Sequence, residues 1–284
     1  MGLRINTNVP ALVAQRNLRI NRAGLDRSLE RLSSGSRINH AGDDAAGLAI
    51  SESLRAQIRG LSQAERNSQD GISLVQVAEG AMAEVSNLLI RMRELGIQAA
   101  SDTVGPTERK FLDVEFQQAI EEIDRIANST EYNGVPLLNG SASAFEVQIG
   151  TKNNPMIDRV KLFDASKTDI NVVSLGINLL NVSDKASAQN GLAALDRALG
   201  QVTSVRAEFG AMQNRLQSVV NNIMVSKENL AAANSRIRDT DLAEETSELT
   251  KNQILQQSGI AVLGQANSSI KTALNLLGGG GGMG

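Results

Sequence analysis

The sequence predicts a mostly α-helical protein: a long antiparallel helical bundle or coiled coil with a small β-hairpin region and with its terminal helices paired as a coiled coil. Three observations predict this fold class. Apolar residues recur at alternating steps of three and four over long stretches, which is typical of helices that pack on helices. Only four prolines occur in 284 residues, so long segments contain no helix breaker. One tyrosine, five phenylalanines and no tryptophan favour thin aliphatic seams over a thick globular core.

The first predicted helix begins after Pro10 and ends at Gly35, which follows two serines. Its leucines recur every seven positions, at Leu18, Leu25 and Leu32. Up to Arg37 the chain has seven arginines and only two acidic residues, so this segment is basic. A polar connector follows, in which Asp43 or Asp44 can cap the next helix.

The second predicted helix runs from Ala45 to about Ser101 without a proline and would be roughly 80 Å long. Its apolar stripe supplies candidate core residues at Ile72, Val75, Met82 and Val85. Pro106 is well placed to open a third helix, which ends near Asn128. That helix adds candidate core residues at Leu112, Phe116 and Ile123.

Residues from about 140 to 180 form the predicted β-hairpin region. Apolar and polar residues alternate from Phe145 to Ile149, which indicates a half-buried strand. An Asn-Asn-Pro sequence at 153–155 marks a turn, and a Tyr-Asn-Gly sequence at 132–134 marks another before the region begins. Further strand is expected at Val160, Leu162 and Ile170–Val173.

The fourth predicted helix, from Ala186 to Ile237, has the most regular pattern in the chain. Its apolar residues alternate steps of three and four over more than four heptads, which indicates a coiled coil. The candidate core residues on it are Phe209, Leu216, Ile223 and Leu230.

The terminal helix has the opposite charge to the first one. From Asp239 onwards the chain has five acidic residues and two lysines. Apolar residues again recur at multiples of seven, at Leu249, Leu263, Ile270 and Leu277, with Gln256 interrupting the series. Opposite charge favours pairing of the two terminal segments with each other or with copies of the chain, and both alternatives remain open.

Both terminal seams are diluted by polar residues such as Arg22, Ser28 and Gln253. Such seams bury little apolar surface, so in a lone subunit this burial would not offset the conformational entropy that the helices lose on ordering. We therefore expect both terminal segments to be disordered in a monomer and to fold on assembly. The glycines from 278 to 282 are expected to close the chain as a flexible end.

The sequence contains little that could carry catalysis. It has no cysteine, and His40 is its single histidine, so neither a zinc site nor a Ser-His-Asp set is expected. A solvated loop histidine is the favoured interpretation of His40 over a weak metal site or a base. No phosphate-binding loop occurs and no apolar run approaches the ~20 residues that span a bilayer. We predict no catalytic, cofactor-binding or metal residues, no cofactor, no nucleic-acid partner, no membrane insertion and no cleaved signal peptide.

Several long motifs occur in a characteristic order. They are Leu29–Asn39, Asp43–Ile50, Asp70–Ser73, Ser235–Asp241 and Gln253–Leu255. With these motifs the chain resembles bacterial flagellin over about 1–140 and 185–277. The resemblance implies a structural subunit that self-assembles into the helical flagellar filament for swimming motility. It also implies an extracellular location, export through the flagellar type III apparatus, an export chaperone, a filament cap and hook-junction proteins as partners.

The resemblance also implies a domain organisation. Residues 1–40 and 240–284 would form the terminal helical domain, D0, and residues 41–239 would form the helical bundle, D1. No outer D2 or D3 domain is expected, because only about 50 residues separate the two matching halves. Within D1, Arg91, Leu95 and Glu115 would be candidate contacts for a vertebrate flagellin receptor.

The sequence is also compatible with two alternative functions. A hook–filament junction protein would share the terminal helices. A soluble coiled-coil adaptor would explain the heptads but not the order of the motifs, and it would form a small fixed oligomer.

Overall fold

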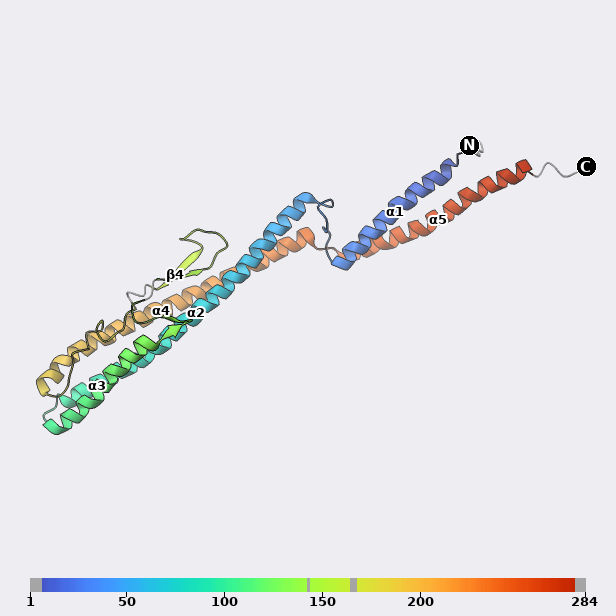
Figure 1. Cartoon of the computed structure of the whole chain (residues 1–284). Helices are drawn as coiled ribbons and strands as arrows, with labels where there is room; N and C mark the ends of the chain where they lie inside the picture. Colours follow the sequence, from blue (N-terminus) through green and yellow to red (C-terminus); the bar gives the residue numbers. More distant parts are fainter. Residues whose placement is uncertain (1–6, 142–143, 164–167, 279–284) are drawn as a thin grey trace, which may run out of the picture. The chain divides into compact units, whose positions relative to one another are not determined.

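The computed structural model describes residues 7–141, 144–163 and 168–278, with side chains as far as Thr272 in the last helix. The predicted fold class is confirmed, since five helices and two small antiparallel sheets make up the described chain. The chain divides into two units, one of residues 1–55 with 230–284 and the other of residues 56–229. Figure 1 shows the elements along the chain.

The helices follow the predicted order with few changes at their ends. Their bounds are α1 Val9–Ser34, α2 Ala45–Ala99, α3 Pro106–Ser129, α4 Lys185–Arg238 and α5 Leu242–Gly278. Long proline-free segments therefore do form single helices, α2 with 55 residues and α4 with 54.

Local signals explain where these helices begin and end. Gly35 ends α1 with φ at 69°, a left-handed conformation that a residue without Cβ adopts easily. Asp44 caps α2, because its Oδ1 accepts a hydrogen bond of 2.8 Å from the Gly47 N–H. Pro106 occupies the first turn of α3, where its missing N–H costs nothing. The helix-end predictions for these positions are confirmed.

Two hairpins follow α3. Strands β1 (Glu131–Tyr132) and β2 (Val135–Pro136) pair across Asn133 and Gly134, whose φ values are 51° and 76°. Two positive φ values in a two-residue loop define a tight hairpin turn that matches the strand twist. Sequence reasoning identified this turn but not its strands, because two-residue strands leave no alternating pattern to detect.

The second hairpin joins β3 (Phe145–Gln148) to β4 (Arg159–Phe163). The expected strand at 170–173 was wrong, since this segment lies in turns and irregular chain. Ile170 still forms one hydrogen bond like that of a strand, from its N–H to the Leu138 carbonyl oxygen at 3.0 Å. Its side chain is buried because the segment packs on the helices, and burial produced the strand-like apolar pattern.

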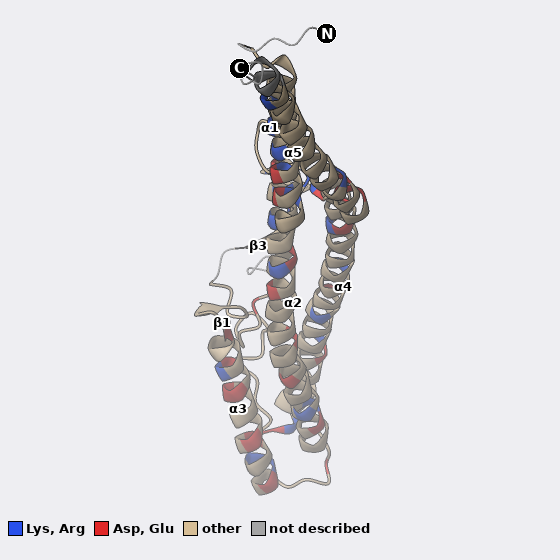
Figure 2. Cartoon of the chain, turned by 90° about the vertical axis from the view of Figure 1, so that its right-hand side faces the viewer, with Lys and Arg blue, Asp and Glu red and all other residues tan. Residues whose placement is uncertain are grey.

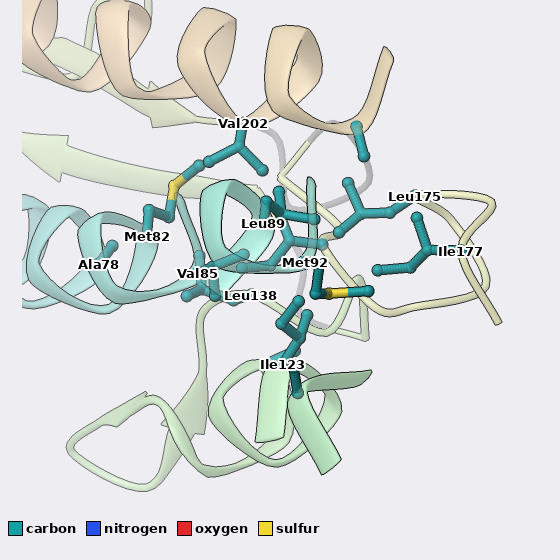
Figure 3. Packing of buried hydrophobic residues seen from close by; sticks show 14 of the residues in the cluster. Ala78, Met82, Val85, Leu89, Met92, Ile123, Leu138, Leu175, Ile177 and Val202 are labelled. Atoms are coloured by element: carbon teal, nitrogen blue, oxygen red, sulfur yellow. The ribbon is translucent and has the colours of Figure 1, made fainter. Parts of the chain in front are cut away.

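One hydrophobic cluster holds residues 56–229 together (Figure 3). It contains the fully buried Met82, Phe116 and Phe209 from three different helices. The hairpin joins it through stacked rings, with centroids 5.1 Å apart for Phe145–Phe163 and 5.2 Å apart for Phe163–Phe209. The other candidate core residues inside this cluster are Val75, Val85, Ile123 and Leu216.

Four candidate core residues lie outside the buried cluster. Ile72 and Leu112 are partly buried against it, and Ile223 is buried further along α4. Leu230 is half-buried and belongs to the other unit.

Candidate assembly surfaces

Helices α1 and α5 form an unusually close antiparallel pair. Within the described residues, they are the only two helices whose Cα atoms approach within 8 Å at many positions. The residues buried on the α1 side are Ala11, Ala14 and Ser28. Those buried on the α5 side are Glu245, Asn252 and Ala266. The small side chains among them, Ala11, Ala14, Ser28 and Ala266, allow the backbones to come close, whereas leucines in those four positions would hold them apart.

Two glycines act as holes for side chains from the facing helix. A Cβ on Gly259 would lie 2.8 Å from Cδ2 of Leu18, and a Cβ on Gly24 would lie 3.1 Å from Nδ2 of Asn252. The ends of the pair are fixed by polar contacts. The Asn8 side chain donates to the Ala266 carbonyl oxygen at 3.1 Å, and Arg31 forms an ion pair of 3.5 Å with Glu245.

The predicted packing residues of the terminal helices flank this seam. All of those with described side chains are half-buried, namely Leu18, Leu25, Leu32, Leu249, Leu263 and Ile270. The side chain of Leu277 lies outside the described residues. Two helices cover only part of each other's apolar face, so leucines at the margin of the seam keep much of their surface. Sequence reasoning missed the buried small and polar residues, because it followed the large apolar ones.

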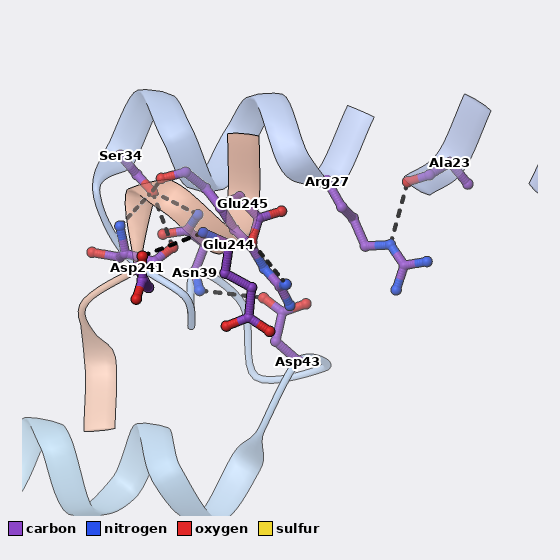
Figure 4. Close-up of polar contacts among 10 residues, drawn as sticks. Ala23, Arg27, Ser34, Asn39, Asp43, Asp241, Glu244 and Glu245 are labelled. Carbon is purple, nitrogen blue, oxygen red and sulfur yellow. Dashed lines mark hydrogen bonds and ion pairs between the residues drawn. The ribbon is translucent and has the colours of Figure 1, made fainter. Parts of the chain in front are cut away.

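The connector between α1 and α2 is joined to the α4–α5 connection. The Arg37 N–H donates to the Arg238 carbonyl oxygen at 2.6 Å, and the Thr240 N–H donates to the Gly35 carbonyl oxygen at 3.1 Å. Ile38, in the same connector, is 1% exposed. Figure 4 shows the polar groups that gather here, from Ser34 to Glu245.

Carboxylates stabilise this junction. Glu52 accepts a hydrogen bond of 2.6 Å from Arg238, and this bond holds the pKa of Glu52 below its ordinary value. Asp43 accepts from the N–H groups of His40 and Asn39, which lowers its pKa in the same way. His40 is mostly exposed and pairs with Glu30 at 2.8 Å, which agrees with the favoured interpretation of a loop histidine.

The outer faces of α1 and α5 expose an unusual amount of apolar surface. Ile20 is 60% exposed and Val262 is 59% exposed. The other large apolar residues exposed on these two helices are Val9, Leu12, Val13, Leu29, Leu242, Ile254, Leu255 and Ile260. These exposed aliphatic side chains are candidate contacts for a partner protein.

The candidate receptor residues lie differently from expectation. Arg91 is exposed and forms ion pairs with Glu115 at 2.7 Å and with Glu94 at 3.1 Å. Hydrogen bonds from Arg91 to Glu115 and then to Glu94 raise the pKa of Arg91. Leu95 is only 1% exposed and belongs to the core cluster, so it cannot meet a partner on the intact surface. The sequence spacing of Arg91 and Leu95 places them on the same side of the helix. It does not show that the rest of the bundle buries Leu95 and leaves Arg91 exposed.

A metal site and a membrane span each have structural requirements that can be compared with the described residues. Among them, no group of three or more histidine, cysteine or acidic side chains could hold a metal ion. In the same part of the chain, no helix is long and apolar enough to cross a membrane.

Comparison with known families matches both halves of the chain. The bacterial flagellin N-terminal helical region matches residues 5–143, and the bacterial flagellin C-terminal helical region matches residues 192–277. A flagellin of Halalkalibacterium halodurans is 46% identical over 96% of this chain and 99% of its own length. A flagellar filament 33 kDa core protein of Treponema phagedenis is 41% identical over 96% of this chain and 99% of its own.

Solved structures agree. The crystal structure of a Bacillus cereus flagellin is 35% identical, with a TM-score of 0.50 over 60% of this chain and 94% of that one. A putative flagellar hook-associated protein of Vibrio parahaemolyticus has a TM-score of 0.56 over 69% of this chain and 100% of that one. Its identity of 14% shows a shared fold alone.

Proposed function

The chain belongs to the bacterial flagellin family and is a structural subunit of the flagellar filament. We propose that its α1–α5 pair makes the contacts that hold neighbouring subunits together. Within this proposal the terminal helices form the filament core domain, D0. The bundle of α2, α3 and α4 with its hairpins forms D1, which transmits the motor's torque as a stiff rod.

The observation that carries this proposal is the mismatch between the inner and outer surfaces of the terminal pair. The inner seam buries alanine, serine, asparagine and glutamate, while isoleucines, leucines and valines remain exposed outside. At about 25 cal/mol per Å² of apolar surface removed from water, burial of those outer residues by neighbours would add stability that the isolated pair lacks. A subunit built in this way gains terminal stability from assembly.

Seeded elongation observed by electron microscopy tests the proposal. Purified full-length chain added to short filament fragments should extend them into long filaments. The same chain without residues 1–40 and 240–284 should neither extend the seeds nor bind their ends. Long filaments from the truncated chain would contradict a role for the terminal pair, and persistent small oligomers of the full chain would contradict unaided filament growth.

The alternative functions receive less support. The 40–46% identical relatives are named flagellins or filament core proteins, whereas likeness to a hook-associated protein extends to the fold only. A coiled-coil adaptor does not account for family matches in both halves. We also infer a purely mechanical role without catalysis, since the family is a structural one.

We infer the partners that this role requires. They are an export chaperone that holds the C-terminal helix, a filament cap that guides assembly, and hook-junction proteins at the filament base. Export in unfolded form through the flagellar type III apparatus is supported by the thin terminal seam, which costs little to open. Pull-down of the full chain against one that ends at residue 240 would test the chaperone assignment, with binding expected only for the full chain.

A vertebrate flagellin receptor is a further inferred partner. Its proposed contacts are the exposed pair Arg91 and Glu115, with Leu95 supporting them from the core. Arg91→Ala should weaken receptor binding without changing the melting temperature, because the ion pairs of Arg91 are exposed and contribute little. Unchanged binding by this variant would remove Arg91 from the contact surface.

A further inference from the structure

Most of the arginines of α1 form no ion pair with a described residue, and Arg31, which pairs with Glu245, is the exception. Arg16, Arg19 and Arg22 form no ion pair with any residue that the structure describes. Arg27 donates to the Ala23 carbonyl oxygen, and within the described chain it has no acidic partner either. Asp26 is the one acidic residue among these arginines in the sequence, so this part of α1 remains basic.

The facing helix cannot supply the missing charge. The antiparallel register places this part of α1 against the part of α5 that runs from Asn252 to Ile270, as the Leu18–Gly259 and Gly24–Asn252 contacts show. That segment contains no charged residue at all. Arg16, Arg19 and Arg22 therefore lie beside a neutral stretch of α5, with their side chains exposed.

The acidic residues of α5 lie at the other end of the pair. Asp241, Glu244 and Glu248 are exposed in and before its first turns, opposite the end of α1. There Arg31 forms an ion pair with Glu245, and Glu248 forms an ion pair of 3.2 Å with Lys251. Figure 2 colours the charged residues along both helices. Arg22 lies nine residues before Arg31, and Arg16 lies fifteen residues before it. The unpaired arginines are therefore about 10 to 25 Å along the helix axis from the acidic end of the pair.

We propose that the outer basic face of α1, formed by Leu12, Arg16, Arg19 and Ile20, docks on the acidic stripe of α5, formed by Glu244 and Glu248, in a second copy of the chain displaced along the helix axis. This inference rests on the proposed function and adds which surfaces meet. Charge complementarity selects the second copy, since each copy carries both an unpaired basic face and an acidic stripe separated along one axis. The arrangement is head-to-tail, so it propagates into an open helical array.

Helical spacing supports a shared docking face. Residues 12, 16, 19 and 20 lie on one side of a helix, away from the buried Ala11 and Ala14. On α5, residues 244 and 248 lie four apart, and Leu255 continues the same stripe seven residues later. Both faces thus combine charge with exposed aliphatic side chains, so they can exclude water as well as attract each other.

Charge-reversed variants test the proposal in seeded elongation. The variant R16E/R19E has acidic residues on both faces, and E244K/E248K has basic residues on both. Each alone should raise the critical concentration for elongation by roughly tenfold or more, because two attractions become repulsions. An equimolar mixture of the two should elongate seeds nearly as well as the unmodified chain, since each variant complements the other.

Further variants separate contacts between copies from contacts within one chain. The chain with all four substitutions should elongate by itself whether the pairs form within or between copies, so its growth shows that the substitutions permit folding. Rescue by the mixture is possible only for pairs between copies. The charge-conserving R16K/R19K should keep the critical concentration within about twofold.

The outcomes are distinct for this inference and for the proposed function. If the unmodified chain fails to extend seeds, the proposed function falls. If the unmodified chain elongates and R16E/R19E elongates equally well, the docking of these faces is wrong. If the four-substitution chain elongates and the mixture does not, the charges pair inside one subunit and the inference is overturned.

Discussion

At the scale of residues, the terminal pair depends on missing side chains as much as on present ones. Gly259 leaves room for Leu18, while no atom lies within 4 Å of a Cβ added at Gly264 on the same helix. We expect Gly259→Val to force α1 away from α5 and Gly264→Val to leave the pair intact. Hydrogen exchange of residues 8–34 in assembled filaments measures this, and equal protection in both variants would show that Leu18 moves aside freely.

A second residue-scale prediction concerns α3. Phe116 is 0% exposed in the core, whereas Phe111 on the same helix is 71% exposed. Phe116→Ala should reduce the free energy of unfolding by about 3–5 kcal/mol, because it leaves a cavity in the buried hydrophobic cluster. Phe111→Ala should change it by less than about 0.5 kcal/mol. Urea denaturation of the monomer compares the two, and similar losses would show that the α3 faces are assigned wrongly.

At the scale of elements, the junction between α1, α2, α4 and α5 should loosen in acid. Glu52 and Asp43 have pKa values below their ordinary 4.5 and 3.8. A carboxyl group whose pKa is lower in the folded state stabilises the fold above its ordinary pKa. That contribution is lost as the pH falls through the lowered pKa. Protection of residues 35–44 from hydrogen exchange, corrected for intrinsic rate, should therefore fall as the pH drops below the ordinary pKa values of these groups.

Substitutions show whether these carboxylates cause the acid effect. Glu52→Gln should already reduce protection at neutral pH and make its pH dependence shallower. Asp102→Asn is the matched control, because Asp102 also has a lowered pKa but pairs with Lys185, far along the chain from the junction. An identical pH profile in Glu52→Gln and the unmodified chain would show that other groups govern the junction.

At the scale of the whole molecule, the terminal helices should be marginal in a lone subunit. Removing residues before about 40 and after about 240 from the monomer should lower the helical circular dichroism by less than the removed length implies. The reason is that a seam of alanines, serine and asparagine buries too little apolar surface to offset the entropy of ordering. A loss of helix equal to the removed length would show that α1 and α5 fold before assembly.

The helices and their ends were predictable because their causes are local. The helix ends depend on residues within one turn, as at Gly35, Asp44 and Pro106. The helix α4 could be predicted because its apolar residues recur with the period of a helix. The strand expected at Ile170 was wrong because a buried irregular segment and a strand have the same apolar content. The exposure of single side chains was harder to predict. Arg91 and Leu95 lie about one helical turn apart, yet Arg91 is exposed and Leu95 is buried.

By itself, the sequence determined the helices, the opposite charges of the two ends and, through its motifs, membership of a filament-forming family. These follow from period, composition and local caps. Only the tertiary structure decided the register of α1 on α5, in which Gly259 faces Leu18 and three arginines, Arg16, Arg19 and Arg22, lie beside an uncharged stretch. Register depends on how side chains from distant parts of the chain fit into one another, and no local pattern contains that information.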